Sequence, residues 1–293
     1  MYVHARHVSC VFFSLLIALA GFSAGAATYT VSNGNDSGPG SLRQAIADVN
    51  AETTGTHTIS FNAAHTITPA SALPALTYTG ARVTFAGTGS TLDGSALTGS
   101  EVGLDIQGTA SISDLTVINF PSHGIAITGN GCLVKGCRIG TDGTSTDEGN
   151  GGDGITVDNV EMLTIGTVSG TGANVISGNG GDGVHTFQCS DLIVAHNYIG
   201  VSDDGTTAIP NGGSGLGLVY SGPGAIGGDA VEERNYLGGN TVYGLLLNFC
   251  AGFVVTGNYV GVAPDGATAV GNGSDGIHLV LSTNNTVGGT ASG

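Results

Sequence analysis

The chain has 293 residues, 53 of them glycine, and carries 22 acidic against 6 basic residues for a formal net charge of −16. So few lysines and arginines exclude the clustered positive charge that nucleic-acid binding needs, and they disfavour an acidic polysaccharide unless a cation bridges the two. The glycine content would fit a disordered linker, but 40% of the residues are hydrophobic, which indicates a packed core if these residues recur at a regular spacing.

The first 27 residues differ from the rest of the chain. A weakly basic start, MYVHARH, precedes the apolar run VSCVFFSLLIALAGF and an A-x-A exit at residues 24–26. This pattern predicts a secretory signal peptide over residues 1–27, and hence a secreted or cell-surface protein, with a retained N-terminal anchor as the alternative. No second apolar stretch follows, so we expect no transmembrane span in the mature chain.

Residues 28–62 form an N-terminal module that does not follow the later repeat. A strand-like TYTV and a turn cluster precede a segment with one apolar helical face, formed by Leu42, Ala45, Ile46 and Val49. Ser41 and Gln44 have the spacing of a capping box, which predicts a helix over residues 41–51. Because the end of a stack of strands exposes an unpaired edge, we expect this helix to cap it.

Residues 63–293 contain a repeat of about 30 residues. In each unit an asparagine is followed four residues later by glycine, and the glycines recur at steps of 29 or 32 residues. The pairs are Asn150 and Gly154, Asn179 and Gly183, Asn211 and Gly215, Asn240 and Gly244, and Asn272 and Gly276. Alternating runs such as IHLVL follow the glycines, as expected for short strands with one buried face.

Short strands of this kind are unstable alone but bury a continuous core when unit stacks on unit. The sequence therefore predicts an all-β fold, a parallel β-solenoid of about seven coils with an N-terminal capping helix. The asparagines would hydrogen-bond to one another along the axis, and the glycines would supply positive φ at a sharp corner. We expect a monomer.

Four cysteines follow the signal peptide, which in an exported protein invites disulfides. Cys189 and Cys250, however, fall two coils and about 10 Å apart, too far for a bridge. We expect buried free thiols there, whereas Cys132 and Cys137 could pair only if their segment bends sharply. The chain ends inside a repeat, at NNTVGGTASG, which predicts a C-terminal truncation or a frayed last coil.

Two parts of the chain resemble known families. The stretch VSNGNDSGPGSLRQAIADVNA, followed by TISFN, resembles the N-terminal module of bacterial exported proteins with a Cys-Ser-Leu-Arg-Glu-Ala signature, although residues 40–45 read GSLRQA here. The units NYIGVSDDGTTAIPN, NVISGNGGDGV and NNTVGG resemble the right-handed parallel β-helix repeats of the pectin-lyase-like superfamily. The resemblance implies a right-handed parallel β-helix, but that fold carries lyases, hydrolases, adhesins and passive surface repeats alike.

The resemblance also implies where chemistry could lie. Pectate lyases of this superfamily bind Ca²⁺ through clustered aspartates and abstract a proton with arginine or lysine. Two aspartates on adjacent coils and two in a nearby loop are the Ca²⁺ candidates: Asp153, Asp182, Asp142 and Asp147. The candidates for catalysis are Lys135, Arg138, Asp153 and Asp182. The alternatives are turn aspartates that bind local backbone N–H groups and solubilising surface cations.

Other family motifs are incomplete. Polygalacturonase-like hydrolases imply an aspartate pair, a His-Gly and an Arg-Ile-Lys; the chain offers Asp203-Asp204 and His123-Gly124, about three coils apart, and no Arg-Ile-Lys. His185 and His278 occupy matching outward positions about 14 Å apart, which cannot share a metal. The sequence therefore favours a structural, adhesive or polysaccharide-contacting protein without an evident catalytic site. A polysaccharide lyase or glycosidase, possibly Ca²⁺-dependent, is the alternative.

Overall fold

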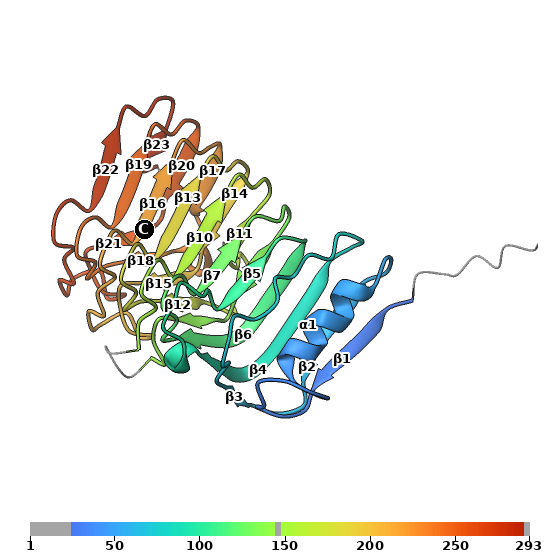
Figure 1. The fold of residues 1–293 in the computed structure, drawn as a ribbon. Helices are drawn as coiled ribbons and strands as arrows, with labels where there is room; N and C mark the ends of the chain where they lie inside the picture. Colours follow the sequence, from blue (N-terminus) through green and yellow to red (C-terminus); the bar gives the residue numbers. More distant parts are fainter. Residues whose placement is uncertain (1–24, 144–147, 290–293) are drawn as a thin grey trace, which may run out of the picture.

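The protein is a solenoid in which short strands wind around one long apolar core (Figure 1). The structure, a computed structural model, describes residues 25–143 and 148–289. Its strands stack in parallel, in register from one turn to the next. The predicted all-β parallel β-helix is thus confirmed.

One face of the solenoid is a seven-stranded sheet. Each turn adds one strand to it, and inward and outward side chains alternate along every strand. In spatial order the strands are β5 (Leu104–Ile106), β7 (Ile125–Ile127), β10 (Ile155–Asp158), β13 (Val184–Phe187), β16 (Leu216–Val219), β19 (Leu245–Asn248) and β22 (Ile277–Val280).

The other two faces belong to one 16-stranded sheet, whose long strands β4 (Val83–Asp93) and β6 (Ala110–Ile118) are shared by both. The first, the β8 arm, comprises β8 (Leu133–Lys135), β11 (Thr164–Gly166), β14 (Leu192–Ala195), β17 (Gly224–Gly227), β20 (Phe253–Thr256) and β23 (Thr286–Val287). The second, the β9 arm, comprises β9 (Arg138–Ile139), β12 (Asn174–Ile176), β15 (Asn197–Ile199), β18 (Tyr236–Leu237) and β21 (Tyr259–Val260). Short 3₁₀ turns η1 (Gly94–Ala96) and η2 (Val231–Glu233) lie in the connections.

The N-terminal module joins the same stack. Strands β1 (Ala27–Val31) and β2 (His57–Phe61) pair in parallel with each other, β2 pairs with β4, and β3 (Thr66–Ile67) also pairs with β4. The solenoid therefore has about 9 turns rather than the seven expected, because strands taken for a separate cap extend it.

Helix α1 (Leu42–Ala51) packs on β1 and β2 (Figure 1) and buries its whole predicted apolar face. The Ser41 hydroxyl accepts the Gln44 N–H at 3.2 Å, as an N-cap should. The Gln44 side chain does not complete the capping box. It donates to Asp48 Oδ1 instead, because the Ser41 N–H already donates to the Gly38 carbonyl. Arg43 pairs with Asp36 at 2.7 Å.

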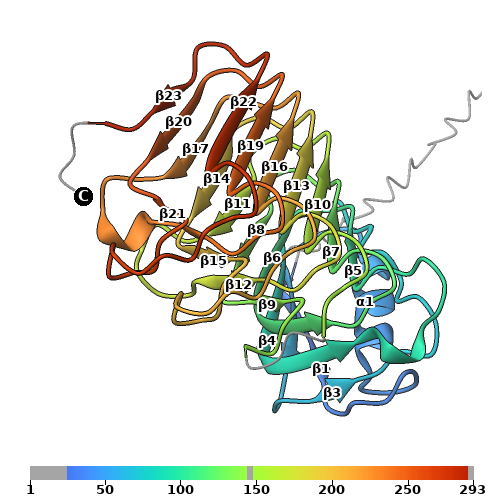
Figure 2. The ribbon, with the colours of Figure 1, turned by 90° about the vertical axis from the view of Figure 1, so that its left-hand side faces the viewer.

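Aliphatic columns fill the interior. The first inward column of the seven-stranded sheet is fully buried over successive turns and consists of Ile125, Ile155, Val184, Leu216 and Leu245. Burial of this kind contributes about 25 cal/mol per Å² of apolar surface and is the main force that holds the turns together. Figure 2 shows the strands stacked along the axis with the last coil, β21 to β23, at the end opposite α1.

The repeated asparagines line up along the axis inside the turn that precedes the seven-stranded sheet. Each side-chain amide donates to the Oδ1 of the next, from Asn150 to Asn179 and Asn211 and on to Asn240 and Asn272, at 2.9 to 3.0 Å. Since these buried amides also bond backbone groups of the neighbouring coils, they fix the register between turns.

The prediction that the repeated glycines supply positive φ at a sharp corner is wrong. None of the five has a positive φ. A Cβ at Gly154 would instead lie 2.6 Å from the Gly183 carbonyl oxygen and 2.8 Å from the Asn179 amide nitrogen, and the same overlap recurs at Gly183, Gly215 and Gly244. Glycine is needed there because the next coil approaches too closely for any side chain.

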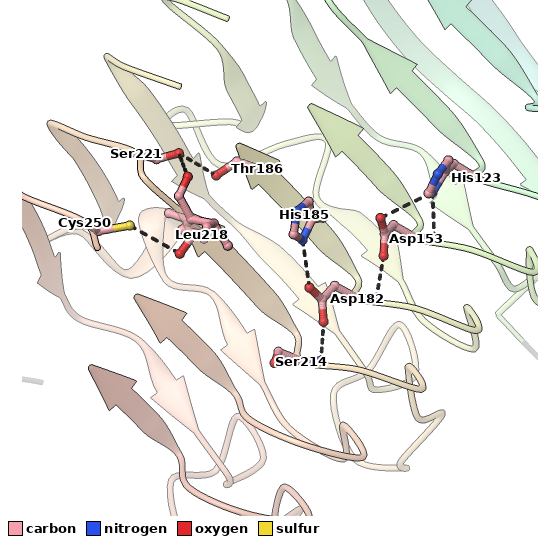
Figure 3. A network of polar contacts seen from close by, with 10 residues as sticks. His123, Asp153, Asp182, His185, Thr186, Ser214, Leu218, Ser221 and Cys250 are labelled. Carbon is pink, nitrogen blue, oxygen red and sulfur yellow. Dashed lines mark hydrogen bonds and ion pairs between the residues drawn. The ribbon is translucent and has the colours of Figure 1, made fainter. Parts of the chain in front are cut away.

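All four cysteines in the described ranges are free and buried, as predicted for Cys189 and Cys250. Those two lie in one column with Ser221 between them, whose hydroxyl accepts the Cys189 N–H. Cys250 donates its S–H to the Leu218 carbonyl at 3.3 Å (Figure 3). Burial raises the pKa of the Cys137 thiol to about 12, so this thiol is unreactive at neutral pH.

Most of the predicted signal peptide, including Cys10, lies outside the described residues, which begin at 25. Within the described ranges the structure holds no helix of the length and apolar character needed to cross a membrane.

Candidate functional site

A row of polar side chains runs across the coils where strands enter the seven-stranded sheet. Each occupies the position directly before the repeated glycine, and the row consists of His123, Asp153, Asp182, Ser214, Tyr243 and Asp275. The first four are joined coil to coil (Figure 3). We call these four residues the Asp-His row.

In each link, a side chain on one coil accepts a hydrogen bond from a backbone N–H group on the next coil. The Asp153 N–H donates to His123 Nδ1 at 2.9 Å, the Asp182 N–H donates to Asp153 Oδ1 at 2.8 Å, and the Ser214 N–H donates to Asp182 Oδ1 at 2.6 Å. Each side chain thus satisfies an amide that no strand partner reaches. The aspartates therefore bind backbone N–H groups, as in the alternative to a Ca²⁺ site. The acceptor, however, lies on one coil and the donor on the next.

Glycines make room for the row. A Cβ at Gly181 would overlap Asp153 Oδ1, and one at Gly213 would overlap Asp182 Oδ1. Gly217, an outward position in the middle of β16, would place a Cβ on Asp182 Oδ2. A glycine inside a strand marks a close approach, and here the approaching group is a carboxylate from the previous coil.

Two of the aspartates carry a histidine three residues on. His185 Nδ1 lies 3.1 Å from Asp182 Oδ2, and His278 Nδ1 lies 2.7 Å from Asp275 Oδ2. The repeated Asp-Gly-aliphatic-His segments at 182 and 275 place these pairs on the outer face of the same sheet, three strands apart. His278 also stacks on Tyr243, with ring centroids 4.5 Å apart.

Hydrogen bonds and nearby charges shift the pKa values of Asp153 and of His185. Burial alone would raise the pKa of Asp153, but the hydrogen bond with His123, the Asp182 N–H and the nearby His185 outweigh it, and the pKa lies below its ordinary value. The hydrogen bond to Asp182 raises the pKa of His185 against the opposing effect of burial, with help from the charge of Asp153. The shift of His185 favours a protonated imidazole beside an ionised Asp182.

His123 has two competing partners. Its Nδ1 accepts the Asp153 N–H at 2.9 Å, which requires an unprotonated nitrogen, yet it also lies 3.3 Å from Asp153 Oδ2, an ion pair that requires a proton there. One nitrogen cannot do both. The shorter contact corresponds to neutral His123 with its proton on Nε2.

The row leaves little for acid–base chemistry. Asp153 Oδ1 and both oxygens of Asp182 serve as hydrogen-bond acceptors, and Asp153 Oδ2 faces His123. Three of these four carboxylate oxygens thus accept hydrogen bonds from protein groups, whereas a catalytic carboxylate needs a proton-transfer path to substrate.

The basic candidates lie on other faces. Lys135 and Arg138 are on β8 and β9 of the 16-stranded sheet, whereas Asp153 and Asp182 precede strands of the seven-stranded sheet. Arg138 pairs instead with Asp203 at 3.1 Å. The structure does not bring the proposed base and the proposed Ca²⁺ aspartates together.

The remaining acidic candidates are dispersed. The Asp142 N–H donates to Glu148 Oε2 at 3.1 Å, and Asp147 lies outside the described residues. Asp204 turns into its own loop, where bonds from Ser202 and Thr206 lower its pKa to about 2. Among residues 25–143 and 148–289, no three His, Cys, Asp or Glu side chains are grouped so as to hold a metal ion.

Sequence reasoning missed three features. One is the Asp-His pairing, which the repeated Asp-Gly-aliphatic-His segments could have indicated. Another is a second asparagine ladder on the β9 arm, formed by the buried Asn174, Asn197 and Asn235 and the half-buried Asn258. The third is aromatic stacking between coils, as in Tyr198, Tyr236 and Tyr259, with centroids 4.6 and 5.2 Å apart.

Comparison with known proteins agrees with this architecture. The family model described as the right-handed beta helix region matches residues 100–291. The chain belongs to this family. No curated protein matches its sequence.

Proposed function

We propose that this is an exported β-helix protein, secreted or displayed at the cell surface, that contacts polysaccharide and does not cleave it. The observation that carries the proposal is the Asp-His row. Its carboxylates are acid–base candidates of the sequence, and they are engaged in hydrogen bonds to the next coil and to His185. A rigid stack with its polar groups satisfied is suited to presenting a surface.

The net charge of the chain limits the kinds of polysaccharide that it can bind. A net charge of −16 repels anionic polymers, so an uncharged glycan is the partner that the electrostatics favour. The N-terminal 27 residues support export by their signal-peptide pattern. The resemblance of residues 28–61 to bacterial exported modules supports the same location.

Two assays on one preparation test the proposal. Purified protein is passed over insoluble neutral polysaccharides, and it is also incubated with polygalacturonate and with neutral glycans, each with and without Ca²⁺. We expect retention on a neutral polysaccharide without unsaturated uronates or new reducing ends. Product formation would establish the alternative, a lyase or a glycosidase. Absence of any retention would remove the glycan-contacting role.

Export is tested separately. Expression of the whole gene in a bacterial host, with N-terminal sequencing of the extracellular fraction, should give a mature chain that begins near residue 28. A chain that stays in the cytosol with its first residues intact would contradict export.

A further inference from the structure

An aromatic cluster is exposed at the corner where the seven-stranded sheet ends. It consists of Phe187, Tyr220 and Phe249 on three successive coils, and we call it the aromatic corner. The Tyr220 and Phe249 rings stack at 4.9 Å with 16° between their planes. Phe187 meets Tyr220 edge to face, at 5.8 Å and 86°. The three residues are 36%, 52% and 43% exposed, so they do not serve the core.

The backbone at this corner is unfavourable for aromatic residues. Tyr220 and Phe249 have φ of 50° and 53°, in the left-handed region. Asn159 and Gln188 hold the same position on the two preceding coils, also at positive φ, and Leu281 holds it on the following coil. Asparagine adopts this conformation at low cost, whereas a bulky residue is strained there. Exposed rings at a strained position call for a role outside the fold.

Unsatisfied polar groups lie beside the rings. Asn248 precedes Phe249, and its Oδ1 is buried without a hydrogen-bond partner. No bond to the Tyr220 hydroxyl is found in the described part of the chain. Nearby on the outer face, His185 and Asp182 add a donor and an acceptor. Exposed apolar rings near the polar side chains of His185 and Asp182 match a ligand that offers both C–H surface and hydroxyl groups.

The exposed area of the aromatic corner and the charges around it indicate which kind of ligand it can bind. Three rings exposed to this extent offer roughly 300 Å² of surface, far below the ~800 Å² per partner of a stable protein interface. The strands that lead to the corner carry no lysine or arginine, whereas Asp158 and Asp182 lie close by on them or before them. A second copy of this chain and an anionic glycan are therefore both poor fits.

We propose that the aromatic corner binds the sugar rings of an uncharged polysaccharide, aligned with the solenoid axis. The exposed rings contact the C–H groups of the sugars. This inference rests on the proposed glycan-contacting function and locates it. The polymer would cross successive coils because the aromatic residues are stacked along the axis.

The test uses asparagine, the residue that the fold itself places at this corner. Tyr220→Asn and Phe249→Asn relieve the left-handed strain, so the variants should fold at least as well as the parent. Met162→Asn is the matched control, since Met162 is also apolar, 59% exposed and at a φ of 60°, but in a different turn. Affinity electrophoresis through gels containing xylan, galactomannan, soluble β-glucan or polygalacturonate measures binding, and circular dichroism checks folding.

We expect the double variant to lose about tenfold or more in affinity for the neutral glycan that the parent binds. Met162→Asn should bind as the parent does. If the parent and the control bind and the double variant binds equally well, the corner is not the site, although the proposed function stands. If no protein binds any neutral glycan, the proposed function itself fails. Concentration-dependent dimerisation that the double variant abolishes would assign the corner to self-association instead and overturn the inference.

Discussion

At the scale of single residues, the Asp-His row joins four successive coils through side chains that accept backbone N–H groups of the next coil. Asp182 has the position, the neighbouring histidine and the partial burial of an active-site carboxylate. Its two oxygens, however, accept the Ser214 N–H and the His185 Nδ1–H. The side chain therefore joins two successive coils and also holds His185 on the outer face.

The loss of unfolding free energy at acid pH should depend on Asp153. Its folded pKa is below the ordinary value of 3.8, so its contribution is present above pH 3.8 and is lost as pH falls through the folded pKa. Asp153→Asn keeps an oxygen for the Asp182 N–H but cannot titrate. We expect the urea midpoint of the variant to fall less steeply between pH 4 and pH 2. If the urea midpoints of the parent and the variant fall equally steeply over this pH range, the prediction is wrong.

His185 should act in the opposite direction. Its folded pKa is above 6.5, so its stabilising contribution is complete below pH 6.5 and disappears as pH rises through the folded pKa. His185→Gln should remove that decline, so the stability of the variant should fall less than that of the parent from about pH 6 to 8. The measurement is the urea midpoint across this range. His65→Gln, an exposed pair with Asn62, is the control and should keep the decline of the parent.

At the scale of strands and turns, sequence reasoning succeeded where residue type and spacing are both regular. The Asn150 ladder was found because its steps are 29 and 32 residues. The ladder on the β9 arm has steps of 23, 38 and 23 residues, since loops of different length precede its members, and it escaped detection. The aromatic corner was missed because one structural position holds Asn159, Gln188, Tyr220, Phe249 and Leu281 in turn.

The fit between strands and the row can be tested at Gly217. Gly217→Ala places a Cβ on Asp182 Oδ2, and overpacking of this kind costs about 1 to 3 kcal/mol of unfolding free energy. In an Asp182→Ser background the same change should cost markedly less, because serine, the residue of the next coil at Ser214, is shorter. A double-mutant cycle by urea denaturation measures the coupling. Additive effects would show that the two positions do not contact each other.

At the scale of the whole molecule, stability comes from columns of similar side chains that stack from coil to coil. The aliphatic columns supply the non-directional attraction, and the two asparagine ladders fix the register. The number of turns was underestimated because β1 and β2 lack the Asn-Gly signature and yet pair in parallel with the stack. Alternation in TYTV and HTISF was visible in the sequence, but partner and direction depend on packing that no local pattern encodes.

Asn211→Ala tests the ladder. Asn211 is fully buried and bonds Asn179, Asn240 and the Ile176 carbonyl. Its removal leaves several buried groups unpaired, and we expect a loss of about 3 kcal/mol in unfolding free energy. Asn272→Ala, at the half-buried end of the same ladder, should cost less than half as much because water can replace its bonds. Equal losses would show that ladder position does not matter.

The most direct test of the whole account is titration calorimetry with a soluble neutral glycan, followed by mass spectrometry of the recovered glycan. We predict saturable binding, with the chain length of the glycan unchanged after prolonged incubation, with or without Ca²⁺. Shortened or unsaturated fragments would contradict this prediction, because the protein would then cleave the glycan that it contacts.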